Sequence, residues 1–259
     1  MINTDEPIRV CPVCGQPIEG IYAFHNYRDN TDTYYRTRIS CRCDQEKESD
    51  YDQIKRMSKI SDIYYRGYCR IKDKTYFFEN DKYLNSEVSR IMRNYAEHFE
   101  EMEKENLGMF LVGDCGGGKT YYAGCIANYV VHHYLKYVLF YPLSELVSRM
   151  RDYNTSEEIK RKISTYPLMV IDDLMLTNEK QIDTVYEIIE ARYSAQKPLI
   201  VTANIEPSVL KDETDVNKKR IYSRLIEVCS YVYSVKKERD ERITIGRENF
   251  TRTKEIMRQ

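Results

Sequence analysis

Residues 107–120 read LGMFLVGDCGGGKT, and this stretch decides the fold of the chain. The apolar run at 107–112 predicts a buried strand, and the residues from Lys119 to Tyr134 predict a helix. Between them, residues 113–120 match the pattern G-x-x-x-x-G-K-S/T in full. A strand, a glycine-rich loop and a helix in this order are typical of a loop that wraps the phosphates of a nucleotide.

The residue types of this loop suit that chemistry. Glycines allow the backbone N–H groups to point at phosphate oxygens, and the following helix adds partial positive charge at its N-terminus. We expect Lys119 to reach the β and γ phosphates and the Thr120 hydroxyl to bind Mg²⁺. A plain glycine-rich turn is the alternative, but the flanking strand and helix argue against it. The predicted nucleotide-binding residues are Gly113, Asp114, Cys115, Gly116, Gly117, Gly118, Lys119 and Thr120, together with Asp172.

Two later strands end in polar residues that could complete such a site. LMVIDD at 168–173 ends in two carboxylates, and we expect Asp172 to hold Mg²⁺ directly or through water. Asp173 would then act as general base on the attacking water. PLIVTAN at 198–204 ends in Asn204, which could orient that water or contact the γ phosphate. Taken alone, each of these strand ends is equally typical of a turn.

Strands and helices alternate along the rest of the chain. Further strands are expected at 136–141 and 231–235, and further helices at 50–66, 82–104, 142–150, 179–196 and 217–230. Apolar strands separated by helices predict an α/β fold with a parallel sheet. Hydrophobic residues make up 42% and charged residues 31%, with a net charge of −1, so no overall basic field draws the chain to nucleic acid. No apolar run of membrane-spanning length and no secretory segment is evident, which predicts a cytoplasmic protein without a membrane partner.

Four of the eight cysteines form two close pairs near the N-terminus. Cys11 and Cys14 lie in a C-x-x-C turn, and Cys41 and Cys43 in a C-x-C pair. Four thiolates can make a closed tetrahedral zinc site, so a structural Zn²⁺ is predicted here. His25 is a possible alternative ligand, and four free thiols in an irregular tail are the other interpretation. Cys69, Cys125 and Cys229 are expected to be small buried hydrophobic residues.

The order GDCGGGKT, VIDD, VTAN and RIYSRLIE resembles the AAA+ ATPases of the DnaC/IstB-like group, the helicase loaders of bacteria and phages. YFFEND at 76–81 is similar to a T-F-E-N-F segment of that group, which implies that Phe78, Glu79 and Asn80 lie near the adenine. The resemblance covers about residues 50–242 and implies a P-loop NTPase with a five-stranded parallel sheet flanked by helices. The domains it implies are a zinc-binding segment at 1–48, a helical linker at 49–105 and an ATPase domain with a reduced C-terminal lid at 106–259.

The resemblance also implies how the chain works. ATP would lie at a subunit edge, with Arg224, or else Arg220, reaching the ATP of a neighbouring subunit as a catalytic arginine. The implied function is ATP-dependent loading of a hexameric replicative helicase onto single-stranded DNA, with slow ATP hydrolysis. DNA binding comes from the resemblance alone, because the basic residues at 160–162 and 218–220 fit a solvated helix face equally well.

Two other functions are compatible with the sequence. One is a transposition helper ATPase of the IstB type, although the N-terminal cysteines favour the loader. The other is a zinc-dependent adaptor whose ATP binding is only regulatory, and the intact set of Lys119, Thr120, Asp172 and Asp173 argues against it.

Overall fold

A computed structural model describes residues 9–11, 15, 17–26, 31–39, 50–176, 179–206, 208–235, 250–254 and 256–257. The chain divides into two compact units, Met1–Tyr65 and Arg66–Gln259, and each is considered by itself. The predicted linker at 49–105 is thus split between the two units, and the predicted domain limits at 48 and 105 stay predictions.

The first unit contains an antiparallel hairpin that the sequence analysis did not predict. Strand β1 (Glu19–Asn26) pairs with β2 (Thr31–Arg38), from Glu19 opposite Arg38 to Asn26 opposite Thr31. Aromatic and β-branched residues in both segments favour extended backbone, but the many turn-forming residues around them hid this signal. Helix α2 (Asp50–Gly67) follows, within one residue of the range that the sequence predicts.

The second unit is built on the five-stranded parallel sheet that was predicted. Its strands are β3 (Met109–Val112), β4 (Val138–Pro142), β5 (Leu168–Asp172), β6 (Leu199–Thr202) and β7 (Tyr231–Ser234), in the order β4-β5-β6-β3-β7. The first four are buried along nearly their whole length, because helices cover both faces of the sheet. Since all the strands run in one direction, the residues that follow β3, β5 and β6 meet at one edge.

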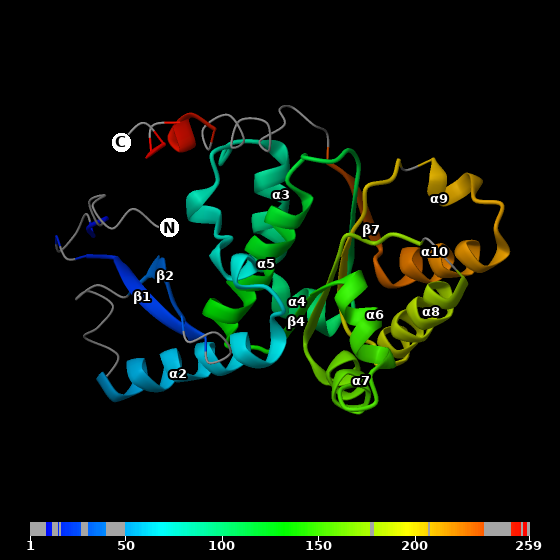
Figure 1. Ribbon diagram of the computed structural model, residues 1–259, viewed down its shortest axis with the longest axis horizontal. Coiled ribbons are helices and arrows are strands. Elements are labelled where there is room, and N and C mark those ends of the chain that lie inside the picture. The colour runs from blue at the N-terminus through cyan, green and yellow to red at the C-terminus, as the bar shows by residue number, and fades with distance from the viewer. Residues whose placement is uncertain are drawn as a thin grey trace. The chain divides into compact units, whose positions relative to one another are not determined.

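Helices form a layer on each side of this sheet (Figure 1). One layer holds α3 (Glu87–Glu97), α4 (Phe99–Lys104) and α5 (Lys119–Tyr134), and the other holds α6 (Leu143–Arg151), α7 (Ser156–Thr165), α8 (Glu179–Ser194) and α10 (Val216–Val228). The short helix α9 (Val209–Asp212) precedes α10. None of the helices within the described ranges is long and apolar enough to cross a membrane.

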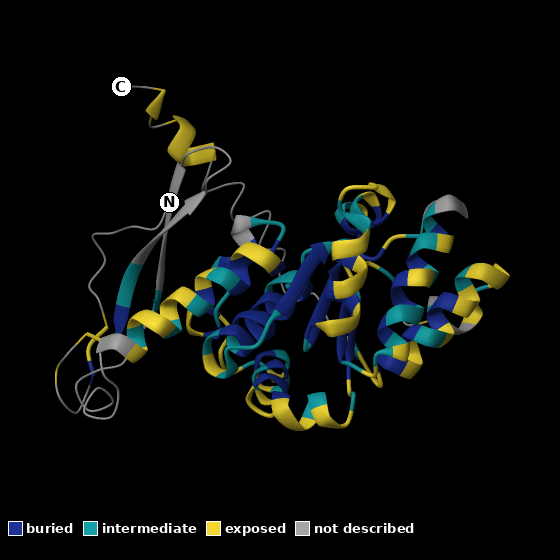
Figure 2. Ribbon diagram, turned by 90° about the horizontal axis from the view of Figure 1, so that it is seen from below, coloured by how far each residue is buried: buried dark blue, intermediate teal, exposed yellow. Residues whose placement is uncertain are grey.

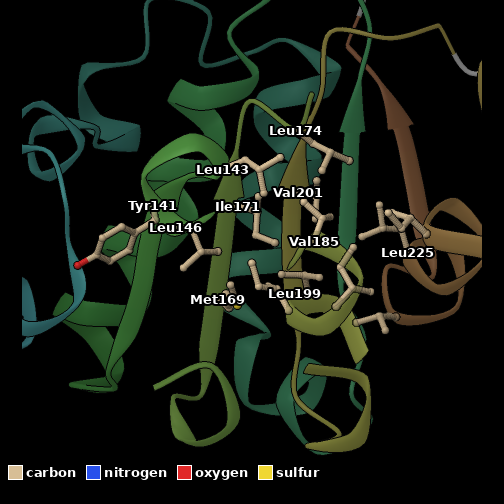
Figure 3. Packing of buried hydrophobic residues seen from close by; sticks show 14 of the residues in the cluster. Tyr141, Leu143, Leu146, Met169, Ile171, Leu174, Val185, Leu199, Val201 and Leu225 are labelled. Atoms are coloured by element: carbon tan, nitrogen blue, oxygen red, sulfur yellow. The ribbon is translucent and has the colours of Figure 1, made fainter. Parts of the chain in front are cut away.

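The strands of the sheet are mostly buried (Figure 2). A hydrophobic core cluster lies between the sheet and the layer of α6, α7, α8 and α10 (Figure 3). Alternate strand residues face it, such as Met169 and Ile171 on β5 and Leu199 and Val201 on β6. These side chains are fully buried, so each strand is fixed in register and its polar end is held in place.

The helices differ from the predicted ones in several places. The predicted helix at 82–104 is interrupted: α3 begins after Ser86, whose hydroxyl accepts the backbone N–H of Ser89, and α4 begins after His98. Helix α7 was missed because its sequence is mostly charged, although Ile159 and Ile163, four residues apart, are buried in the core. Two short 3₁₀ turns, η1 (Ile71–Thr75) and η2 (Phe78–Asn80), were also not predicted.

Candidate nucleotide-binding site

The glycine-rich loop joins β3 to α5 and has the backbone that its sequence requires. Gly113, Gly116 and Gly118 have φ angles of 121°, 88° and 87°, in the left-handed region that favours glycine. A Cβ atom at Gly113 would lie 2.6 Å from the carbonyl oxygen of Val235, so a larger residue would collide with backbone. Gly118 is the N-cap of the 16-residue α5, so the loop lies at the positive end of that helix.

The ammonium group of Lys119 lies against this loop. Its Nζ donates hydrogen bonds to the carbonyl oxygens of Gly113 and Asp114, at 2.8 and 2.6 Å. Lys119 is 6% exposed, whereas Asp114 and Cys115 at the tip of the loop are exposed. The Lys119 ammonium is therefore held where a loop of this shape turns its N–H groups toward phosphate.

Asp172, the last residue of β5, connects three separate parts of the chain. Its Oδ1 accepts hydrogen bonds from the hydroxyls of Thr120 and Thr202, both at 2.7 Å. Its Oδ2 accepts one from Nη2 of Arg70, also at 2.7 Å. Asp172 is 2% exposed, so its charge is stabilised by these donors rather than by water.

Asp173 and Asn204 lie together beside this buried carboxylate. The side-chain Nδ2 of Asn204 donates to Oδ1 of Asp173 at 3.0 Å, and both residues are exposed. Asp173 has a φ of 59°, and its backbone N–H donates to the Thr202 hydroxyl at 2.9 Å. Thr202 thus fixes both acids, one buried and one facing solvent.

These groups have the chemistry that a magnesium nucleotide requires. A hydroxyl and a carboxylate are hard oxygen ligands of the kind Mg²⁺ prefers, and they lie beside a phosphate-binding type of loop. The residues therefore fit Mg²⁺ together with the phosphates of a nucleotide.

The two arginines implied by the family resemblance lie on α10. Their contacts are with residues of α8 and α10. Arg224 donates from Nη1 to Glu227 at 2.9 Å, approaches Glu190 of α8 at 3.3 Å and lies over the Tyr193 ring at 4.6 Å. Arg220 lies over the ring of Tyr186 at 4.7 Å. Both guanidinium groups therefore belong to the surface that α8 and α10 share.

The segment expected near the adenine begins with a buried aromatic ring. Phe78 is 2% exposed and packs between the guanidinium of Arg93, at 4.8 Å, and the ring of Tyr129, at 6.4 Å. Glu79 and Asn80 are exposed. Their role toward adenine stays a prediction.

The predicted zinc ligands fall mostly outside the described residues. Cys11 is described and is buried, whereas Cys14, Cys41 and Cys43 are not among the described residues. Within the described part of the chain, no group of three or more His, Cys, Asp or Glu residues could hold a metal ion. The zinc site therefore stays a prediction. Of the other cysteines, Cys125 and Cys229 are buried as expected, and Cys69 is only partly so.

Two residues of the network were not predicted from the sequence. Thr202 stands in the VTAN segment, where a hydroxyl next to the end of an apolar strand could have been recognised as a partner for the site. Arg70 had no such signal, because it precedes Asp172 by 102 residues and lies in no motif. Only the folded chain brings it to the carboxylate.

Comparison with known proteins assigns the chain to a family. The profile of the bacterial DnaA ATPase domain matches residues 72–227, which is more than half of the chain. The chain is 26% identical over 147 residues to the replicative helicase loader DnaC of Buchnera aphidicola subsp. Schizaphis graminum, covering 52% of this chain and 58% of the relative. It is 25% identical over 138 residues to the replicative helicase loader DnaI of Bacillus subtilis, covering 48% of this chain and 44% of the relative.

The chain spans about half the length of these relatives. Its fold is similar to the crystal structure of the DnaC helicase loader, with a TM-score of 0.54 and 19% identity, over 64% of this chain and all of that one. At that identity the likeness concerns the fold. Because the matching profile spans the phosphate loop, both acids, Asn204 and Arg224, the chain belongs to the family of the bacterial DnaA ATPase domain, as a DnaC-like AAA+ ATPase.

Proposed function

We propose that this protein binds and hydrolyses ATP in order to load a hexameric replicative helicase onto single-stranded DNA in the cytoplasm. The observation that carries the proposal is the similarity to two replicative helicase loaders, over about half of the chain, combined with an intact set of site residues. A chain that kept the fold for an adaptor role alone would not need both acids and Asn204 in one bonded group.

The roles of the site residues follow from their positions. The N–H groups of residues 113–120 and the Lys119 ammonium bind the phosphates, while Thr120 and Asp172 hold Mg²⁺. The metal supplies charge neutralisation on the phosphate oxygens when it is bound. Asp173 accepts the proton of the attacking water, and Asn204 orients this carboxylate through its amide.

The site is completed by a second copy of the chain. Arg224 is about one-third exposed and lies on the outer side of α8 and α10, where its partners are Glu190 and Glu227 of the same chain. These partly exposed ion pairs are weak and can be exchanged for the phosphates of a neighbour's nucleotide. We therefore assign the catalytic arginine to Arg224, acting in the adjacent subunit, with Arg220 as the second choice.

The N-terminal segment that carries the four cysteines is the proposed contact with the helicase. Cys11, Cys14, Cys41 and Cys43 have the number and type of ligands for one structural Zn²⁺. A segment of this length with little other core would gain its stability from the metal and present its outer surface to a partner. The ATPase part would hold single-stranded DNA.

A pull-down from the host, with and without ATP, tests the proposed function. The full chain should retain a hexameric replicative helicase, and retention should depend on the nucleotide. Lys119→Ala should lose that dependence, while Lys160→Ala, an exposed lysine on α7, should behave as the parent chain. Recovery of a transposase instead would establish the IstB-type alternative, and ATP-independent recovery of another protein would support the adaptor.

A further inference from the structure

Arg70 makes a bond that the proposed mechanism does not use. Its guanidinium is shared between two carboxylates: Nη2 donates to Asp172 at 2.7 Å and Nε donates to Asp73 at 2.8 Å. Both acids are almost fully buried, with side chains 3% and 1% exposed, while the Arg70 side chain is 39% exposed. One fixed positive charge therefore neutralises the metal-binding acid from outside the loop.

The backbone that carries Arg70 is tied to the sheet. Gly67 lies so close to β4 that a Cβ atom would overlap the carbonyl oxygen of Val138. Tyr68 forms a parallel bridge with Phe140, and the N–H of Cys69 donates to the Phe140 carbonyl at 3.2 Å. The segment thus adds to the free edge of the sheet at β4, next to β5 and its terminal Asp172.

The residues after Arg70 are fixed from the other side by helix α5. The buried side chain of Asn128 donates from Nδ2 to the carbonyl oxygens of Asp73 and Tyr76, at 2.9 and 2.7 Å, and accepts from the Tyr68 hydroxyl at 3.0 Å. Arg70 therefore approaches Asp172 from a short segment anchored at both ends. Its position beside the site is built into the fold.

Arg70 and Mg²⁺ require the same atoms. Oδ1 of Asp172 already accepts two hydroxyls, so Oδ2 is the oxygen with fewer donors, and the guanidinium is on it. A carboxylate oxygen bonded to a guanidinium is a poorer metal ligand because the positive charges repel and the lone pairs are engaged. Asp73 remains as a partner that can keep Arg70 when its bond to Asp172 is broken.

We propose that Arg70 is a positioning residue that holds Asp172 in place and is exchanged for Mg²⁺ when the magnesium nucleotide binds, retaining Asp73 as its partner. The proposal rests on the proposed nucleotide site. Metal binding then breaks the ion pair between Arg70 and Asp172. The guanidinium of Arg70, which belongs to residues 67–76, moves as a result. The nucleotide state is thereby transmitted to the segment that follows α2 directly in the chain.

A magnesium titration of nucleotide binding tests this exchange without requiring hydrolysis. The probe is a fluorescent methylanthraniloyl-ADP, and the quantity compared is the Mg²⁺ concentration for half-maximal binding by the full chain. Arg70→Ala removes the competitor, so this concentration should fall by about 1.5-fold to fivefold, the range for losing one partly exposed ion pair. Arg70→Lys keeps the positive charge but loses the two-pronged geometry of the guanidinium. Its half-maximal Mg²⁺ concentration should lie between those of the parent chain and Arg70→Ala.

Arg151→Ala is the matched control, because that arginine lies at the end of α6 and bonds to Thr184. It should leave the magnesium requirement unchanged. A requirement that stays equal or rises in Arg70→Ala would overturn the exchange, and a rise would instead assign Arg70 a supporting role in metal binding. Parent protein that fails to bind the probe at any Mg²⁺ concentration would instead remove the nucleotide site itself, and with it the proposed function.

Discussion

Two regions of the second unit, Arg66–Gln259, differ in how their charged groups are bonded. At the edge where β3, β5 and β6 end, Asp172 is buried and bonded to residues 30, 52 and 102 positions away in sequence. On the surface of α8 and α10, Arg224 pairs with the half-buried Glu190 and with the exposed Glu227, which is three positions away. The first group is set by the fold, while the second can change partners at little cost. We expect this contrast in a chain that holds one half of an ATP site in place and offers an arginine to the ATP site of a neighbouring subunit.

The largest effect is expected at the buried edge. Lys119→Ala should abolish nucleotide binding, because the loop loses its only side-chain cation while its N–H groups remain. Equilibrium binding of a fluorescent ATP analogue measures the change. Lys160→Ala, on the exposed face of α7, is the control. The nearby Lys162 is unsuitable because it is buried and donates a hydrogen bond to the Arg66 carbonyl. ATP affinity that is unchanged in Lys119→Ala would contradict the site.

A selective effect is expected on the α10 surface. Arg224→Ala should leave ATP binding by the isolated chain nearly intact, because Arg224 pairs with Glu190 and Glu227 and not with the loop. Hydrolysis in the presence of single-stranded DNA should fall by at least about tenfold, since a catalytic arginine stabilises charge only in the transition state.

Turnover under those conditions, measured by phosphate release, separates the two outcomes for Arg224. Lys104→Ala on α4 provides a control for the loss of one exposed positive charge. Normal DNA-stimulated turnover by Arg224→Ala would refute its assignment, and the same experiment on Arg220→Ala would then identify the second candidate.

The smallest effect on the ATP site is expected from the N-terminal segment. Metal analysis should find one Zn²⁺ per chain, and Cys14→Ser should lose it because a thiolate ligand is removed. ATP binding should change little, because the loop, both acids and Arg70 all belong to Arg66–Gln259. Cys115→Ser, at an exposed thiol outside the predicted cluster, should keep the metal. A folded parent protein without zinc would contradict the cysteine prediction.

Local sequence was sufficient to predict most of the sheet and the glycine-rich loop at 113–120. The β3 strand, the loop and α5 are adjacent in the chain, and each has its own signal: an apolar run, positive-φ glycines and a helix start. The positions of Asp172 and Asn204 at one edge could be predicted because strand ends of a parallel sheet meet there, while their roles stay predictions.

What escaped prediction depends on tertiary contacts. Arg70 directly precedes the 3₁₀ turn η1, and its place beside β5 is set by Gly67, Phe140 and Asn128, none of which forms a sequence motif with it. Helix α7 was hidden by its charged residues, since only Ile159 and Ile163 mark its buried side. For Arg70 the deciding interactions come mainly from residues remote in the chain, whereas α7 was missed because few apolar residues mark its buried side.

Mixing two inactive variants tests the shared site most directly. Lys119→Ala lacks the phosphate-binding lysine but keeps Arg224, and Arg224→Ala has the opposite defect, so an assembly of both contains some interfaces with one intact half from each chain. ATP hydrolysis by the equimolar mixture, with single-stranded DNA present, should rise clearly above that of either variant alone. A mixture no more active than its components, at concentrations where the parent chain hydrolyses ATP, would contradict a site completed by Arg224 of a neighbouring subunit.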